Sequence, residues 1–274
     1  MHAVTANGAS IPALGFGTFR MSPADTLRMV PHALRLGFRH IDTAQIYGNE
    51  AEVGEGIANS GIARGDIFLT TKVWVENYRR DAFVASVEES LRKLRTDHVD
   101  LLLLHWPSET VPLAEQIGAL NDVRQAGKVR HIGVSNFNTA LMAEAARLSS
   151  APVVTNQIEV HPYLDQAKVI AAARAAGMAV TAYYAMADGK VFDDPVLKAI
   201  AAGHGKSVAQ IVLRWLVQQD GMVALSKTVG EARAAENLAI FDFELTREEM
   251  AAVDRLAQPD GRLVSPPGLA PAWD

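Results

Sequence analysis

The segment Gly15-Phe16-Gly17-Thr18-Phe19-Arg20 decides between the two folds that the rest of the sequence allows. It follows the first apolar run of a regular strand–helix alternation. At this position an open nucleotide-binding sheet carries the pattern G-x-G-x-x-G, which holds the phosphates of its ligand. The segment begins with this pattern, but Arg20 stands where the third glycine is needed. We therefore favour a closed (β/α)8 barrel over an open doubly wound sheet.

Outward from this segment, short apolar runs alternate with amphipathic stretches along the chain. The apolar runs predict strands at residues 14–17, 40–42, 68–72, 99–105, 131–135, 154–159, 179–184 and 222–226. The amphipathic stretches predict helices at residues 23–36, 50–60, 80–94, 113–126, 139–149, 165–176 and 208–219. Because parallel strands need long crossover connections, this order predicts eight β/α units in a single TIM-barrel domain over residues 1–274.

Turn and cap residues mark the ends of several elements. Asn7-Gly8 predicts a tight hairpin that pairs residues 4–6 with residues 10–12 ahead of the barrel. Ser22-Pro23 is typical of a helix start, and Gly37 stands where that helix should end.

Composition excludes several classes of function. The 274 residues include 26 Lys and Arg against 31 Asp and Glu, a formal net charge of -5, which disfavours nucleic acid as a partner. The chain has no cysteine, which excludes disulfides and cysteine nucleophiles. The histidines lack the spacing of a zinc site, so we expect no metal. No apolar run approaches the length of a membrane span and no signal peptide is visible, so we expect a cytoplasmic protein without a membrane partner.

Polar side chains end several of the apolar strands, on the barrel face where such folds place their active sites. Asp42, Lys72 and His105 are three of them, and Tyr47 follows Asp42 by five residues. An aspartate facing a lysine forms an ion pair, and a nearby cation lowers the pKa of a tyrosine hydroxyl. Such a tyrosine can act as a general acid while a neutral histidine donates a hydrogen bond to a carbonyl oxygen. The same residues could instead form a structural salt bridge, a buried core histidine and a pocket wall.

Aromatic residues near these strand ends are candidates to line a substrate pocket, because aromatic side chains often line small-molecule sites. Trp74 directly follows the Lys72 strand, and Phe19, Trp106 and Trp273 are the other candidates. Trp106 could equally pack at the barrel rim, and Trp273 could belong to a docked tail.

Several separate motifs resemble those of the aldo-keto reductase family. The first runs from Gly37-Phe38-Arg39-His40-Ile41-Asp42-Thr43-Ala44 through Tyr47-Gly48-Asn49-Glu50 to Val53-Gly54. The second is Ile132-Gly133-Val134-Ser135-Asn136-Phe137, and Thr71-Lys72-Val73-Trp74 and Leu104-His105-Trp106-Pro107 also match. The segment Arg262-Leu263-Val264-Ser265-Pro266-Pro267-Gly268-Leu269-Ala270-Pro271 resembles the bacterial 2,5-diketo-D-gluconate reductase B subgroup of this family.

The resemblance implies NADPH-dependent reduction of a carbonyl on a (β/α)8 barrel, with a C-terminal tail over the active-site face. Tyr47 would be the acid, Lys72 would lower its pKa, Asp42 would pair with Lys72, and His105 would orient the carbonyl. Further residues would hold the nicotinamide. These are Ser135, Asn136 and Gln157 at its carboxamide and Tyr183, which would stack on its ring.

The resemblance also implies a site for the 2′-phosphate and adenine of NADPH. Two cations and a hydroxyl surround the start of a predicted helix, a favourable place for a phosphate. The residues are Lys227, Thr228 and Arg233 for the phosphate, and Glu236 and Asn237 for the adenine. A solvated helix start is the alternative interpretation.

Two segments depart from the family pattern. Ser226 stands where a proline is common, which should loosen the turn, and Tyr184 replaces a serine in a loop that normally approaches the pyrophosphate. The contacts of residues 184–188 are therefore open.

We expect a monomeric NADPH-dependent reductase of small polar carbonyls, such as a 2,5-diketo sugar acid or a 2-oxoaldehyde like methylglyoxal. One alternative is a cofactor-binding regulatory subunit of the same fold. Another is a barrel hydrolase or isomerase that uses Asp42 and His105 without nicotinamide.

Overall fold

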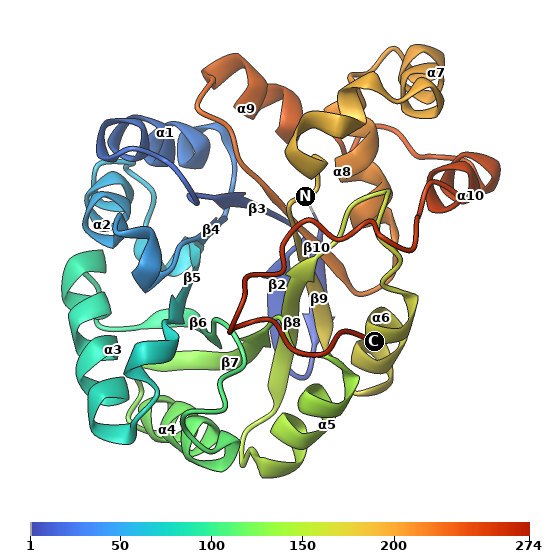
Figure 1. Cartoon of the computed structure of the whole chain (residues 1–274). Coiled ribbons are helices and arrows are strands. Elements are labelled where there is room, and N and C mark those ends of the chain that lie inside the picture. Colours follow the sequence, from blue (N-terminus) through green and yellow to red (C-terminus); the bar gives the residue numbers. More distant parts are fainter. Residues whose placement is uncertain (1) are drawn as a thin grey trace.

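A closed barrel of eight parallel strands forms the centre of the computed structural model, which describes residues 2–274 (Figure 1). The strands follow one another around the barrel in the order β10-β3-β4-β5-β6-β7-β8-β9. Their bounds are β3 (Leu14–Gly17), β4 (His40–Asp42), β5 (Phe68–Val73), β6 (Val99–Leu104), β7 (Val129–Ser135), β8 (Val153–Glu159), β9 (Ala179–Tyr183) and β10 (Met222–Ser226). The predicted fold class is confirmed, and each predicted strand end agrees to within two residues.

A small antiparallel hairpin, β1 (Ala3–Ala6) and β2 (Ala9–Pro12), precedes the barrel as predicted. Asn7 and Gly8 have φ angles of 44° and 87°, the left-handed backbone that a two-residue hairpin turn needs. The Asn7 Nδ2 atom donates to the Val153 carbonyl at 2.8 Å. Because Val153 begins a barrel strand, the hairpin is tied to the end of the barrel opposite the predicted site.

Helices surround the barrel on its outside (Figure 1). Their bounds are α1 (Pro23–Leu36), α2 (Glu50–Ala58), α3 (Arg80–Leu94), α4 (Leu113–Gln125), α5 (Thr139–Leu148), α6 (Ala167–Ala175), α7 (Pro195–His204), α8 (Val208–Gln218), α9 (Glu231–Leu238) and α10 (Arg247–Asp254). Helix α6 begins two residues later than predicted, and Asp165 Oδ1 accepts a hydrogen bond from Ala167 N just ahead of it. Helix α7 was absent from the predicted helices, although Asp194 caps it and Pro195 opens it.

The glycine of the Val53-Gly54 motif has a packing reason. A Cβ atom on Gly54 would lie 2.5 Å from the Lys93 carbonyl oxygen of helix α3, closer than such atoms approach. The glycine therefore lets helices α2 and α3 touch.

Two apolar regions form the core. The larger lies between the barrel and the helices, and all six residues of β6 are buried. The smaller fills the barrel interior, where Leu101, Leu103 and Val223 pack with Ile11 of the hairpin. Replacing Ile11 by alanine should cost about 2–5 kcal/mol through the cavity it leaves. The apolar filling occupies the hairpin end of the barrel, and the polar strand ends gather at the opposite end.

The C-terminal tail, residues 258–274, crosses that opposite face, drawn in red in Figure 1. It begins beside the loop after β8, where Gln258 N donates to the Tyr163 carbonyl at 3.0 Å. The predicted position of the tail over this face is confirmed. Among residues 2–274, no helix combines the length and apolar character that crossing a membrane requires.

Candidate active site

A buried ion pair lies at the carboxyl end of β4 and β5. Lys72 Nζ donates to Asp42 Oδ1 at 2.7 Å and to the Thr43 carbonyl at 2.8 Å. It also donates to the Tyr47 hydroxyl oxygen at 3.2 Å. Lys72 is fully buried and Asp42 is 2% exposed, so neither charge is solvated by bulk water. The structure thus brings Asp42, Lys72 and Tyr47 into one chain of hydrogen bonds.

A short 3-10 turn, η1 (Gln45–Tyr47), places Tyr47 above the lysine. Gly48 ends the turn in the left-handed conformation, with φ of 68°. Gln45 fixes the turn to the next loop, because its Oε1 accepts from Trp74 N at 2.9 Å and from Asn77 Nδ2 at 3.0 Å. The loops after β4 and β5 therefore jointly fix the position of Tyr47.

Within this chain of hydrogen bonds, the pKa of Tyr47 differs from the expectation. Burial raises the pKa of the Tyr47 hydroxyl well above its usual range, and the Asp42 carboxylate raises it further. Burial therefore outweighs the lowering of this pKa that was expected from the nearby cation. Burial also lowers the pKa of Lys72, although Asp42 opposes that effect. A high pKa keeps Tyr47 protonated at neutral pH, and this is the form from which a proton can be donated.

His105 follows β6 and faces Tyr47, with the two ring centroids 5.7 Å apart. Burial lowers the pKa of His105 well below its usual range, and the positive charge of Lys72 adds to the effect. The imidazole is therefore neutral at physiological pH, as expected.

Tyr78 is a supporting residue that the sequence analysis did not single out. Its hydroxyl donates to the Trp106 carbonyl at 2.8 Å and accepts from Trp106 N at 3.2 Å. These bonds fix the segment that carries His105. The sequence holds no local signal for this role, because Tyr78 and Trp106 are 28 residues apart.

The four residues expected at the nicotinamide lie together at the ends of β7, β8 and β9. Gln157 Nε2 donates to Asp42 Oδ2 at 2.9 Å, which connects this group to the ion pair. Asn136 Nδ2 donates to the His105 carbonyl at 3.0 Å, and the Tyr183 hydroxyl donates to Asn136 Oδ1 at 2.6 Å. Ser135 Oγ donates to the Gln157 carbonyl at 2.8 Å. These amides and hydroxyls form a polar floor beside Tyr47 and His105.

The five residues expected at the far end of NADPH lie on α9 or in the segment just before it. Lys227 and Arg233 are exposed, and within residues 2–274 neither forms an ion pair with a carboxylate. The Arg233 side chain folds over Gly230, which caps α9 without a side-chain hydrogen bond. Thr228 is buried and its Oγ1 accepts from Gly230 N at 3.1 Å. Glu236 is half-buried on the same helix.

Ser226 differs from the expectation that it would loosen the turn. It is 2% exposed, and its hydroxyl accepts a hydrogen bond from Asn237 Nδ2 at 2.9 Å. The serine thus ties the end of β10 to helix α9. The loop at residues 184–188 is held within itself, because the Tyr184 hydroxyl donates to Asp188 Oδ1 at 2.6 Å.

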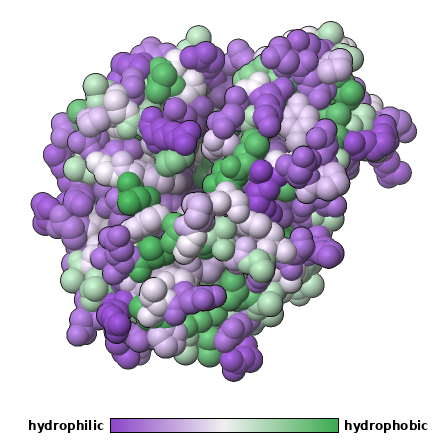
Figure 2. All heavy atoms as spheres, viewed as in Figure 1, coloured by the Kyte–Doolittle hydropathy of each residue, from purple (hydrophilic) through white to green (hydrophobic). Residues whose placement is uncertain are grey.

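Aromatic side chains surround the ion pair and histidine at the barrel mouth. Phe19 packs on Tyr47 with ring centroids 4.9 Å apart, and Trp74 packs on His105 at 5.3 Å. Trp106 is 6% exposed and its ring meets that of Trp273 from the tail at 6.4 Å. Figure 2 shows apolar residues gathered around a hollow on the face that the tail crosses. Ile46, 50% exposed beside Tyr47 in η1, was not among the predicted pocket residues.

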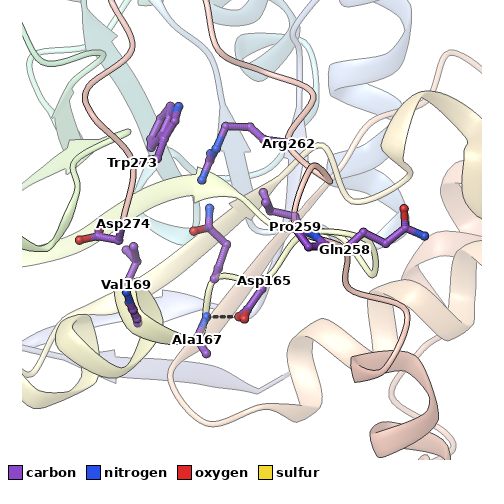
Figure 3. A pocket seen from close by; sticks show the side chains of 11 residues that line it. Asp165, Ala167, Val169, Gln258, Pro259, Arg262, Trp273 and Asp274 are labelled. Carbon is purple, nitrogen blue, oxygen red and sulfur yellow. Dashed lines mark hydrogen bonds between the residues drawn. The ribbon is translucent and has the colours of Figure 1, made fainter.

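A separate cavity of about 420 Å³ lies beside the tail rather than at these residues. Its lining includes Gln166 and Val169 near the start of α6, and Arg262 and Trp273 of the tail (Figure 3). None of the four predicted catalytic residues lines it. Among residues 2–274, no group of three or more His, Asp or Glu side chains is arranged to hold a metal ion.

The fold and the side chains at its mouth define a (β/α)8-barrel oxidoreductase. Residues 13–258 match the model of the Aldo/keto reductase family, and the chain belongs to this family. It is 46% identical to methylglyoxal reductase DkgB of Salmonella typhimurium, with 97% of this chain and 100% of that protein covered.

Two solved structures show the same fold. One is a crystal structure of a protein assigned as a 2,5-diketo-D-gluconic acid reductase B. It has a TM-score of 0.99 and 72% identity, with 100% of this chain and 98% of that chain covered. The other is an aldo-keto reductase of Bombyx mori in complex with NADP. It has a TM-score of 0.88 and 36% identity, with 94% of each chain covered.

Proposed function

We propose that this protein reduces the carbonyl group of small polar aldehydes and ketones to an alcohol with NADPH. The leading substrates are 2-oxoaldehydes such as methylglyoxal, and 2,5-diketo-D-gluconate. The observation that carries the proposal is the buried Lys72–Asp42 pair, with Lys72 bonded to the Tyr47 hydroxyl and neutral His105 facing the Tyr47 ring. The names of the relatives at 46% and 72% identity support these two substrate classes.

The side chains present fit a nicotinamide dinucleotide phosphate. Lys227 and Arg233, which form no ion pair with a carboxylate within residues 2–274, offer positive charge beside the start of α9, where free backbone N–H groups favour a phosphate. Asn136, Gln157 and Ser135 offer amide and hydroxyl groups that suit a carboxamide. The Tyr183 ring would lie against the nicotinamide. NADPH would supply the hydride, and the protein the placement and the proton.

In the proposed reaction, His105 and Tyr47 both direct hydrogen-bond donors at the substrate carbonyl oxygen. Because His105 is neutral, it orients the oxygen without competing as the proton source. Tyr47 donates its proton as negative charge develops on that oxygen. Lys72 Nζ, 3.2 Å from the Tyr47 oxygen, then stabilises the phenolate that remains. Asp42 holds Lys72 in position through the 2.7 Å bond.

The test follows NADPH absorbance with a panel of 2,5-diketo-D-gluconate, methylglyoxal and aromatic aldehydes. The wild-type protein should oxidise NADPH with at least one of them, and Tyr47→Phe should lower kcat by about 100-fold or more. Tyr163→Phe removes a hydroxyl that bonds Asp194 away from the site and serves as the matched control. NADPH binding without oxidation by any substrate would favour the regulatory-subunit alternative. Full activity of Tyr47→Phe would remove that residue from the acid role.

The cofactor preference has its own test. Arg233→Ala should raise the KM for NADPH by about tenfold or more, with little effect on the KM for NADH, because only NADPH carries the 2′-phosphate. Arg247→Ala removes the same charge from an exposed position on α10 and is the control. Equal effects of Arg233→Ala on both cofactors would remove this residue from the phosphate site.

We further propose that residues 1–274 act as a single-domain, cytoplasmic monomer. The tail packs back on the barrel at Tyr163, which supports one folded unit. Sedimentation of the purified protein at micromolar concentration tests the monomer, and a dimer mass would contradict it.

A further inference from the structure

Glu159, the last residue of β8, is a buried carboxylate that the proposed reaction does not use. It is fully buried, yet the reacting groups are held by other residues. A buried carboxylate is costly unless several donors satisfy it, so its partners indicate what it does.

The partners of Glu159 come mainly from the C-terminal tail. Leu263 N donates to Oε1 at 2.7 Å and Val264 N donates to Oε2 at 2.9 Å. Arg262 adds a guanidinium at 3.8 Å from Oε2. His161 Nε2, just after β8, lies 2.9 Å from Oε1 and is the remaining partner of the Glu159 carboxylate. Three consecutive tail residues are therefore held by one side chain of the barrel.

The far end of the tail is held at a second point. Thr139, the first residue of α5, donates from its backbone N to Asp274 Oδ2 at 2.9 Å and from its hydroxyl to Asp274 Oδ1 at 2.6 Å. Asn138 Nδ2 donates to the Ala272 carbonyl at 2.9 Å. Both contacts are exposed, whereas the Glu159 contacts are buried or half-buried, so Glu159 is the stronger of the two anchors.

At the second anchor, the tail reaches the aromatic wall next to His105. Trp273 meets Trp106 at 6.4 Å, and Trp106 directly follows His105. The Arg262 guanidinium lies 3.7 Å from the centre of the Trp273 ring (Figure 3). This cation–π contact joins the part of the tail held by Glu159 to the part held at Thr139. Releasing the Glu159 end would therefore remove the support that Arg262 gives to the Trp273 ring at the barrel mouth.

We propose that Glu159 is a positioning residue that sets substrate affinity by holding the tail across the mouth through the N–H groups of Leu263 and Val264. This proposal rests on the proposed reductase function. The tail would touch the part of the substrate away from the reacting carbonyl. A long substrate such as 2,5-diketo-D-gluconate should thus depend on Glu159 more than methylglyoxal does.

Glu159→Gln is the direct test, because the amide keeps the size of the side chain but turns an –NH2 group toward one of the tail N–H groups. It should raise the KM for 2,5-diketo-D-gluconate by about tenfold, since a hydrogen bond to a charged group is lost. It should leave kcat and the NADPH Kd within about twofold of wild type. Hydrogen–deuterium exchange of residues 258–274 should become faster. Glu144→Gln makes the same chemical change at an exposed position in α5 and is the control.

Val264→Pro is the second variant, which removes one donor from the tail and leaves the barrel unchanged. It should reproduce the change in KM and exchange if Glu159→Gln does not fold. Thr139→Val weakens the other anchor and should raise the same KM by a smaller factor. Unchanged exchange of the tail in the Glu159 or Val264 variant would overturn the proposal. So would a loss of NADPH affinity equal to the rise in KM, because that indicates a general structural effect. Exchange needs no turnover, so failure of the proposed reaction and failure of the Glu159 anchor are distinguishable.

Discussion

His40 should make the stability of this protein depend strongly on pH between 7 and 4.5. Burial lowers the pKa of this side chain from 6.5 to about 4 in the folded protein. Its Nε2 lies 3.0 Å from Thr70 Oγ1, and its ring packs edge-on against Phe68. A Cβ atom on Gly15 would lie 2.8 Å from its Nδ1, so the site has little room for a shell of water.

The direction of the pH dependence of stability follows from whether the folded or the unfolded protein binds the proton more tightly. Because the folded pKa is lower than the unfolded value, the stability contribution is fully present above pH 6.5 and is lost as the pH falls toward 4. A difference of this size is worth about 3.4 kcal/mol when fully expressed. Between pH 7 and pH 4.5 it amounts to about 2.4 kcal/mol.

The assay is urea unfolding at pH 7 and pH 4.5 for wild type and His40→Gln. The substitution costs stability at both pH values through lost packing, but it removes the titrating group. The loss of stability between the two pH values should therefore be about 2.4 kcal/mol smaller in the variant than in wild type. An equal loss in both proteins would refute the reasoning. So would a His40 ring proton signal that titrates near pH 6.5 in the folded protein.

Three further predictions concern the candidate site. Lys72→Met should lower kcat by about 100-fold or more and leave the NADPH Kd nearly unchanged, because among residues 2–274 the Lys72 ammonium bonds only Asp42, Thr43 and Tyr47. Steady-state rates measure the first effect and fluorescence titration the second. Because burial lowers the pKa of His105 and raises that of Tyr47, kcat/KM should stay level from about pH 6 to pH 9. A fall between pH 7 and pH 6 in a pH–rate profile would contradict a neutral His105. Tyr78→Phe should lower the free energy of unfolding by about 1–3 kcal/mol through its two lost bonds to the Trp106 backbone, and a change below 0.5 kcal/mol in urea unfolding, about the level of an ordinary surface substitution, would contradict it.

Much of the fold was predictable because its signals are local. Asn7-Gly8 adopts the left-handed turn that this pair favours, and Ser22 caps the helix that Pro23 opens. Helix α7 was missed although Asp194-Pro195 carries the same kind of signal. Such signals depend on neighbouring residues in the chain, so they can be read without the tertiary structure.

The residues of the candidate site were predictable from the sequence, but the pKa of Tyr47 was not. Asp42, Lys72, Tyr47 and His105 stand at strand ends, and parallel strands bring such ends to one face. The direction of the pKa change at Tyr47 was wrong, because burial outweighs the nearby cation and burial depends on the whole fold. The role of Tyr78 was also hidden, since it depends on a contact across 28 residues.

The sequence by itself determined the barrel, the order of its strands and the residues at its mouth. These follow from the periodicity of apolar residues and from motifs of adjacent positions. Only the tertiary structure decided that Glu159 holds the tail, since this carboxylate and its donors lie 104 and 105 residues apart in the chain. The same holds for the direction in which the pKa of Tyr47 is moved. Solvent exposure and the approach of distant charges set these properties, and neither is encoded in any short stretch of residues.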